Sequence, residues 1–239
     1  MKKILFTLCI ALLACVAMQA RTYVLAVGVS NYQGTSNDLS NTTKDAKSFK
    51  KLMENKTKDI TLVTSRYATK ANIKEKLRAI SNRAGAGDQV IFFYSGHGAD
   101  GCLAVYDGML TYSDIVNILD SSKADMKVCY IDACHAGTAV SAQPTSAQAA
   151  SGKKNMVFFV SCRPDEYSFE NSVVGAGFFT QALTKGLRGK SDSNGDKRVT
   201  VSELFKYMYN DVVKRSDSLQ HPQLICPEAM KNAVLIDWN

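Results

Sequence analysis

The chain has 239 residues, of which 46% are hydrophobic and 21% are charged, and its formal net charge is +7. This composition is that of a folded globular protein and excludes the disordered and collagen-like classes. The basic residues are scattered and form no stripe, so we expect no nucleic-acid partner.

The first residues have the pattern of an export signal. Lys2 and Lys3 precede an apolar run over residues 4–18. This run is shorter than a typical membrane-spanning helix and is typical of a secretory signal peptide. No second apolar run of comparable length follows, so we expect no transmembrane span in the mature chain.

Cleavage of this signal has two possible outcomes. Cleavage after Ala20 would separate a signal peptide, residues 1–20, from one folded domain, residues 21–239, and this is the outcome that we expect. Residues 12–15 (LLAC) resemble a lipobox, so a lipid anchor at Cys15 is the alternative. Either outcome predicts an exported protein that is periplasmic, secreted or attached to the cell surface.

Beyond residue 21, short apolar runs alternate with helical patterns. In chain order, strands are predicted over residues 22–29, 60–64, 89–94, 127–132, 155–161 and 233–236. Helices are predicted over residues 43–54, 69–83, 112–119, 178–187 and 201–214. The strands are hydrophobic almost throughout, as expected for strands buried on both faces. The alternation therefore predicts an α/β fold, a three-layer α/β/α sandwich with a mostly parallel central sheet.

Two unusual clusters follow two of the predicted strands. One is SGHG at residues 95–98, and the other is DACHAG at residues 132–137. Because carboxyl ends of parallel strands share one edge, we expect both clusters at that edge. A thiol nucleophile needs a neighbouring base and main-chain N–H groups for the developing oxyanion. We therefore predict His97 as base, Cys134 as nucleophile, and the N–H groups of Gly98 and Cys134 as oxyanion donors.

Each of these residues also has a structural interpretation. Taken alone, His97 is a loop histidine and Cys134 a buried thiol. His135 is a competing base, but neighbouring side chains diverge, so we expect it to be structural or at the rim. Cys129 and Cys162 lie in strand-like runs and are expected to be buried as small hydrophobic residues. A metal site at Cys134, His135 and His97 is disfavoured because no spacing resembles a zinc module.

Together and in this order, the two clusters resemble the paired signature of caspases and metacaspases. In that family the histidine is the general base and the cysteine forms a thioacyl intermediate. The resemblance extends to residues 24–32 (VLAVGVSNY), 39–46 (LSNTTKDA), 175–183 (GAGFFTQAL) and 221–224 (HPQL), in the same order. It implies a caspase-haemoglobinase-like fold and a cysteine endopeptidase over about residues 22–237.

The residue two positions before the nucleophile indicates the substrate. Around the nucleophile, the sequence of animal caspases resembles Q-A-C-x-G, and these enzymes hold a P1 aspartate in a basic pocket. This chain has Asp132 at the first position of that motif. An acid beside the nucleophile favours a cationic P1 side chain. In metacaspases this acid, a second acid in an early loop and a serine before the histidine line the P1 pocket. The resemblance maps them onto Asp132, Asp45 and Ser95, so we predict cleavage after Arg or Lys.

Both acids have structural alternatives. Asp132 suits an acid that caps a turn, and Asp45 suits a carboxylate in the first turn of a helix. Residues 41, 42 and 44 are Asn, Thr and Lys, where metacaspases usually carry Gly, Cys and Asn. Asp38 is close enough in the sequence to take the place of Asp45.

Residues 139–152 are small and polar and predict a long loop within the domain. Lys153 and Lys154 follow this loop, and family members are often cut in this connection. An enzyme that prefers basic P1 residues would cut itself there. The alternative is an ordinary solvated loop end.

Residues 192–203 resemble a calcium-binding EF-hand loop, with oxygen-bearing side chains at positions 1, 3, 5, 9 and 12. Position 6 is Lys197, where the sharp turn requires Gly. We therefore expect a turn into a helix capped by Thr200 or Ser202. The thiol chemistry requires no cofactor, calcium dependence is left open, and no metal ligand is assigned.

Three classes of function fit these residues. The leading one is a cysteine endopeptidase whose partner is a protein or peptide with a basic P1 residue, working as a monomer. The second is a catalytically silent caspase-like binding module. Such modules usually lack the catalytic histidine or the catalytic cysteine, whereas this chain has both His97 and Cys134. The third is another thiol hydrolase or acyl-transfer enzyme, and Asp132 favours the peptidase over it.

Overall fold

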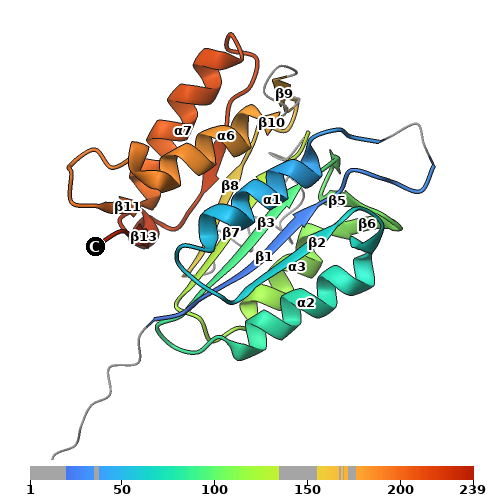
Figure 1. The fold of residues 1–239 in the computed structure, drawn as a ribbon, viewed down its shortest axis with the longest axis horizontal. Coiled ribbons are helices and arrows are strands. Elements are labelled where there is room, and N and C mark those ends of the chain that lie inside the picture. The colour runs from blue at the N-terminus through green and yellow to red at the C-terminus, as the bar shows by residue number, and fades with distance from the viewer. Residues whose placement is uncertain (1–19, 35–37, 135–154, 167, 169, 172–175) are drawn as a thin grey trace, which may run out of the picture.

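The computed structural model describes residues 20–34, 38–134, 155–166, 168, 170–171 and 176–239. A six-stranded sheet in the order β12-β8-β7-β3-β1-β2 forms its centre (Figure 1). Its strands are β1 (Thr22–Gly28), β2 (Ile60–Thr64), β3 (Gln89–Ser95), β7 (Met126–Asp132), β8 (Met156–Val160) and β12 (Gln223–Ile225). Neighbouring strands from β8 to β2 are parallel, and β12 runs antiparallel to β8.

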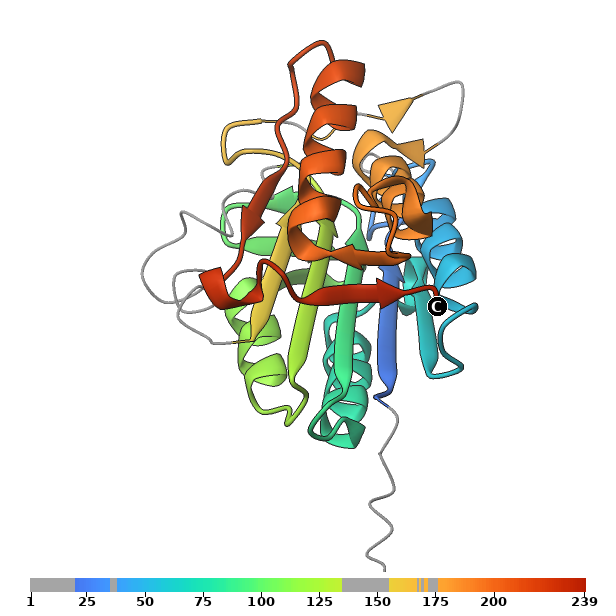
Figure 2. The ribbon, with the colours of Figure 1, turned by 90° about the vertical axis from the view of Figure 1, so that its left-hand side faces the viewer.

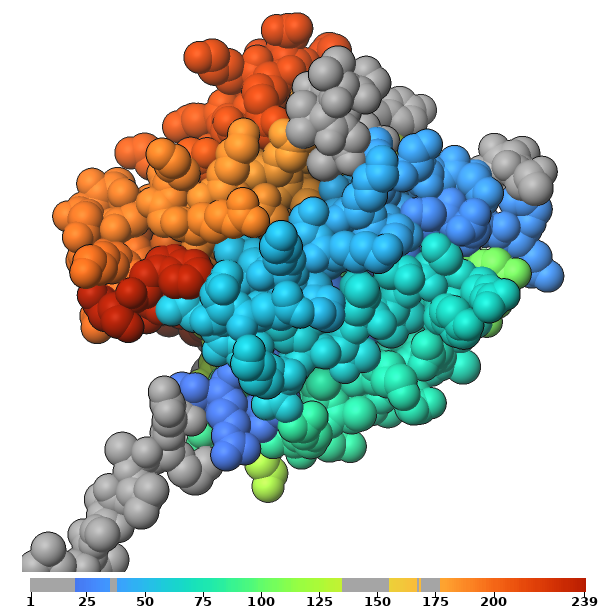
Figure 3. Space-filling view, viewed as in Figure 1, coloured from blue at the N-terminus to red at the C-terminus, as the bar shows by residue number. Residues whose placement is uncertain are grey.

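Helices cover both faces of this sheet (Figure 2). They are α1 (Thr42–Met53), α2 (Lys70–Arg83), α3 (Tyr112–Asp120), α6 (Phe178–Lys185) and α7 (Val201–Arg215). Successive strand residues point to opposite faces. Leu25 and Val27 pack in a core with α2 and α3, whereas Val24 and Ala26 pack in a second core with α1, α6 and α7. The predicted three-layer α/β/α sandwich is therefore confirmed, and Figure 3 shows α1 and α6 adjacent on the outer surface.

Two features of the sheet edge were not predicted from the sequence. The predicted strand at residues 233–236 exists as β13 (Val234–Asp237), but it pairs with β11 (Arg198–Thr200) outside the central sheet. The antiparallel edge is formed by β12, in a segment where no strand was predicted. β12 has three residues, which is too short for a hydrophobic period to reveal a strand.

Several short elements were also not predicted. They are β4 (Gly98–Ala99), β5 (Cys102–Val105), β6 (Gly108–Thr111), β9 (Glu170–Asn171), β10 (Ala176–Gly177), η2 (Ser65–Tyr67), η3 (Gly186–Lys190) and η4 (Glu228–Met230). β4, β5 and β6 form a small antiparallel sheet directly after β3. This small sheet matters for function because it contains the residue that follows His97.

The register of the central sheet brings the two sequence clusters together. β3 and β7 pair in parallel along seven residues, and their last pair is Ser95 opposite Asp132. Both strands therefore end at the same level of one edge, as predicted. The end of β1 lies against the start of α1, since a Cβ on Gly28 would lie 2.4 Å from the Thr42 carbonyl oxygen. This close approach places α1, and with it Asp45, at the same edge.

The segment that resembles an EF-hand loop leads into a capped helix. Thr200 caps α7, and Glu203 completes a capping box with it. Glu203 also accepts hydrogen bonds from the main chain and hydroxyl of Ser193. Lys197 adopts a left-handed φ of 61° where an EF-hand has Gly. Over the ranges that the structure describes, no group of three or more His, Cys, Asp or Glu is arranged to hold a metal ion.

The described helices include none that is long and apolar enough to cross a membrane. Cys129 and Cys162 are fully buried, as predicted for small hydrophobic residues. Burial raises the pKa of the Cys129 thiol far above its usual range, so this thiol is inert at neutral pH.

Candidate active site

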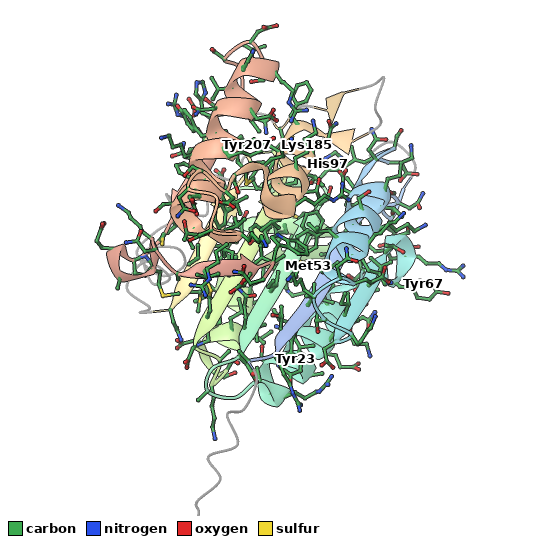
Figure 4. The ribbon with its side chains drawn as sticks, turned by 60° about the vertical axis from the view of Figure 1, so that its left-hand side comes forward. Tyr23, Met53, Tyr67, His97, Lys185 and Tyr207 are labelled. Carbon is green, nitrogen blue, oxygen red and sulfur yellow. The ribbon has the colours of Figure 1, made fainter. Side chains whose placement is uncertain are left out.

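A cavity of about 240 Å³ lies at the carboxyl ends of β3 and β7. Its lining includes His97, Cys134, Asp45, Asp132 and Ser95, the five side chains that the sequence indicated. These residues come from α1, from β3 and β7, and from the turns that follow the two strands. No Lys or Arg is among the described residues that line it. Figure 4 shows His97 beyond the ends of the central strands.

The main chain of His97 is held from both sides. Its N–H donates a hydrogen bond to the Tyr32 hydroxyl, with an N–O distance of 2.8 Å. Its carbonyl oxygen accepts bonds from the Ala104 N–H at 3.0 Å and from the Tyr94 hydroxyl at 2.8 Å. The ring of Tyr32 also lies beside the imidazole, with 4.9 Å between ring centroids. These contacts fix the position of the histidine at the mouth of the cavity.

Tyr32 remains protonated beside the site. Burial raises the pKa of Tyr32 to about 12, and the charges of Asp38 and Cys134 act in the same direction. Its hydrogen bonds with the His97 main chain and with Tyr94 oppose the rise without cancelling it. At neutral pH the group beside His97 and Cys134 is therefore a neutral phenol, which does not repel a thiolate.

The peptide that precedes Cys134 is clamped by a fully buried serine. The Ala133 N–H donates to the Ser161 Oγ at 3.0 Å, and the same hydroxyl donates to the Ala133 carbonyl at 2.8 Å. The Cys162 Sγ lies 3.4 Å from that carbonyl oxygen. Since Ser161 immediately follows β8, the neighbouring strand holds the backbone that presents the Cys134 thiol.

Gly98 contacts the main chain of Cys134. A Cβ at Gly98 would lie 2.4 Å from the Cys134 carbonyl oxygen, so the two backbones approach more closely than any other residue would allow. The His97 carbonyl accepts from Ala104 N–H, and Gly98 is opposite Leu103. Gly98 and Leu103 therefore form a non-hydrogen-bonded pair, and the Gly98 N–H points away from β5. The Gly98 amide therefore makes no ladder hydrogen bond with β5 and lies beside the main chain of Cys134.

Asp132 is 5% exposed and is held by α6 and by the loop after β8. One carboxylate oxygen accepts from the Ser168 hydroxyl at 2.6 Å. The other accepts from the Thr180 N–H at 3.2 Å and from the Thr180 hydroxyl at 2.7 Å. Gly177, the N-cap of α6, leaves room for this carboxylate, because a Cβ there would lie 2.5 Å from it. Asp132 therefore accepts hydrogen bonds from the first turn of α6 and also lines the cavity. A structural capping role and a role in the P1 pocket are compatible for this residue.

Asp45 and Ser95 form the second acidic part of the cavity. Asp45 is 1% exposed, lies in the first turn of α1, and accepts a hydrogen bond from the Ser95 hydroxyl at 3.1 Å. Asp38, the alternative acid, is exposed and accepts from the Tyr32 N–H at 3.0 Å and the Asn31 amide at 3.1 Å. Asp38 does not line the cavity. The acid at the cavity is therefore Asp45.

A buried glutamine that sequence reasoning missed joins the parts of the site. Gln220 is fully buried, and its amide donates to the Ser161 carbonyl at 2.8 Å and to the Ser168 hydroxyl at 3.3 Å. It therefore links the clamp on the Ala133 peptide with the hydroxyl that binds Asp132. Tyr32, Ser161 and Ser168 were also missed as site residues. No spacing marks them, because each acts through a contact with a residue distant in sequence.

Several predicted features lie outside the described residues. They are His135, the loop at residues 139–152, Lys153, Lys154 and the candidate lipid-anchor residue Cys15.

Comparison with known proteins identifies the family. The sequence profile of the caspase domain matches residues 21–234. A crystal structure of a protein from Geobacter sulfurreducens is similar, with a TM-score of 0.68, 18% sequence identity, and coverage of 89% of this chain and 97% of that chain. This structural likeness concerns the fold alone. No curated protein sequence matches the chain. The family profile spans most of the chain, and the protein therefore belongs to the caspase-domain family of cysteine peptidases.

Proposed function

We propose that the protein is a cysteine endopeptidase that hydrolyses peptide bonds after Arg or Lys. One observation carries this proposal. A single cavity contains a cysteine, a histidine and two buried carboxylates, and none of its described lining residues is Lys or Arg. The first pair suits thiol-based acyl transfer, and the second suits a cationic side chain.

In the proposed reaction His97 takes the proton of Cys134, and the thiolate attacks the scissile carbonyl carbon. The N–H groups of Gly98 and Cys134 bind the oxyanion that forms. The C–N bond then breaks, His97 gives its proton to the leaving amine, and the acyl group remains on sulfur. His97 next takes a proton from water, which attacks the thioester. Collapse of this second intermediate releases the acid and returns the proton to the thiolate.

The carboxylates of Asp45 and Asp132 would select the P1 residue. Both are almost completely buried and line the same cavity as His97 and Cys134. A P1 guanidinium or ammonium in that cavity would lie beside two carboxylates, which attract a positive charge. A P1 aspartate would bring a third carboxylate into the same small space, which explains the predicted discrimination against it.

A panel of fluorogenic peptides tests this function. The purified protein would be incubated with peptides that differ only in P1, as Arg, Lys, Asp or Ala. We expect turnover of Arg and Lys peptides only, and covalent labelling of Cys134 by an electrophile with a basic P1 group. Preference for Asp would overturn the pocket assignment. Absence of both turnover and labelling would identify a silent binding module instead. Parallel reactions with calcium or EDTA test our further proposal that no cofactor is required.

We also propose self-cleavage at Lys153 or Lys154, which lie outside the described residues. A basic-specific enzyme would convert its own chain there into two parts that stay associated. Intact-mass spectrometry of the purified protein should show this cut in the wild type and not in Cys134→Ala. A cut of equal extent in both proteins would assign the cleavage to another protease.

We also propose that the protein acts outside the cytoplasm. It is proposed to be a monomer that acts on protein or peptide substrates. The apolar run after Lys2 and Lys3 supports export. Size-exclusion chromatography with light scattering tests the monomer, and a dimer mass would contradict it.

A further inference from the structure

Asp88 is a buried carboxylate remote from the candidate active site. It lies immediately before β3 and is 5% exposed. The seven residues of β3 separate it from the cavity by about 23 Å at the usual rise per strand residue. One of its oxygens accepts a hydrogen bond from the Arg21 N–H at 2.8 Å, and the other from the Gly85 N–H at 2.8 Å.

Among the residues that the structure describes, no side-chain cation lies within ion-pair distance of this carboxylate. Asp88 is absent from every ion pair formed within the described part of the chain. Arg21 is exposed, and the described residues contain no ion pair between its guanidinium and Asp88. A carboxylate this deeply buried is normally accompanied by a cation, because hydrogen bonds from neutral N–H groups compensate only part of its lost hydration.

Arg21, the second residue of the described range that begins at Ala20, is held by its main chain. Its nitrogen donates to Asp88, and its carbonyl oxygen accepts from the Gln89 N–H at 2.8 Å. Ala20, directly before it, is exposed. Ala20 is also the small residue at which the export signal is expected to end. Cleavage at that point would turn the Arg21 amide nitrogen into an α-ammonium group at the position where Asp88 accepts its hydrogen bond.

We propose that the Ala20–Arg21 bond is a maturation site and that the α-ammonium group released there forms a buried ion pair with Asp88. The step is a hydrolysis by an export peptidase. Water adds across the bond, so that Ala20 leaves as a carboxylate and Arg21 keeps a protonated amine. The protein's own proposed activity would cut after Arg21 and not before it, so this maturation is independent of Cys134.

The ion pair would strengthen the contact between the starts of β1 and β3. A charge-assisted hydrogen bond is roughly twice as strong as a neutral one. The domain therefore gains stability only after the leader is removed. The inference does not depend on the proposed peptidase function, because its measurement is of stability and of chain mass.

Four chains test the ion pair, all in the Cys134→Ala background to exclude self-cleavage. One begins at Arg21, released from a fusion partner without added residues. The matched control begins at Ala20, which moves the ammonium group one residue away. The other two carry Asp88→Asn at each start. At pH 7 we expect the Arg21 start to melt about 2–4 °C above the Ala20 start, and this difference to disappear with Asp88→Asn. Equal melting temperatures at the two starts, or a difference that persists with Asp88→Asn, would overturn the ion pair.

A pH series gives a second measurement if Asp88→Asn does not fold. Pairing with Asp88 raises the folded-state pKa of the α-amine above its ordinary value of about 8. Its stabilisation is therefore complete below that value and is lost as the pH rises through the raised pKa. Two cavities adjoin Arg21 and Asp88, and the charged side chains other than Asp88 that line them are present in both chains. Their contributions therefore cancel in the difference between the two melting temperatures: Arg21, Glu54, Lys56, Lys58, Asp59, Arg83, Asp125 and Asp237. A difference that does not fall between pH 7 and pH 10 would contradict the proposal.

The maturation site itself is tested by expressing the full chain with its own leader in a bacterial host. Intact mass and N-terminal sequencing of the exported protein should place the first residue at Arg21, in wild type and Cys134→Ala alike. A first residue at Cys15 with an added lipid mass, or any start other than Arg21, would exclude it.

Discussion

Replacing either Cys134 or His97 with Ala should reduce kcat/KM on a peptide with Arg at P1 by at least about 10³-fold. Without the thiol no acyl intermediate can form, and without the imidazole the thiol keeps its proton and the leaving amine receives none. The double variant should lose about as much as either single variant, because the two groups act in the same step. Initial rates measured at equal concentrations of folded protein provide the comparison.

The stability of these variants should change little. Both side chains are only half buried, and the contacts that fix the two loops involve main-chain atoms of His97 and Ala133. Cys102→Ala is the matched control, since Cys102 is a half-buried thiol in β5 that does not line the cavity. It should retain both activity and labelling. A variant at Cys134 that still turns over peptide, or loss of activity in Cys102→Ala, would contradict the assignment of the nucleophile.

Asp132→Asn should lower kcat/KM on the Arg peptide by about 10²–10³-fold, which corresponds to about 3–4 kcal/mol. The variant removes a buried negative charge that would pair with the P1 cation. The same variant should change the much lower rate on an Ala peptide only a few-fold. The effect is thus a loss of discrimination, read from the ratio of the two kcat/KM values.

Related variants show whether the charge or the packing is responsible. Ser168→Ala removes one hydrogen bond to Asp132 and keeps its charge, so it should have a smaller effect on the same ratio. Asp45→Asn should lower the ratio, because Asp45 faces the same cavity. Asp38→Asn is the control, since this exposed acid lies outside the cavity. An equal loss on Arg and Ala peptides in Asp132→Asn would show that this residue supports the fold of the site and does not select the substrate.

Asp132→Asn should also lower the melting temperature by a few degrees. An amide can accept hydrogen bonds with its oxygen only, whereas Asp132 accepts with both oxygens, from Ser168 and from Thr180 at the start of α6. One of these donors would then face an NH₂ group. The specificity ratio is independent of this destabilisation when it is measured well below the transition.

Local patterns in the sequence were sufficient for the main elements and for the dyad candidates. Continuous apolar runs identified the parallel strands, because strands buried on both faces need no polar residues. The clusters at residues 95–98 and 132–137 follow two such strands, and in a parallel sheet the strand ends share one edge. The positions of His97 and Cys134 at one cavity could therefore be predicted before any contact was known.

The tertiary structure alone decided how that site is held together. Ser161 contacts Ala133 across 28 residues, Gln220 contacts Ser161 across 59, and Tyr32 contacts His97 across 65. No periodicity links positions so far apart, since such contacts depend on which strands are neighbours and in which register. For the same reason β12, and not β13, forms the edge of the central sheet. The chemical groups could be recognised from local sequence, whereas their orientation and support follow from long-range packing.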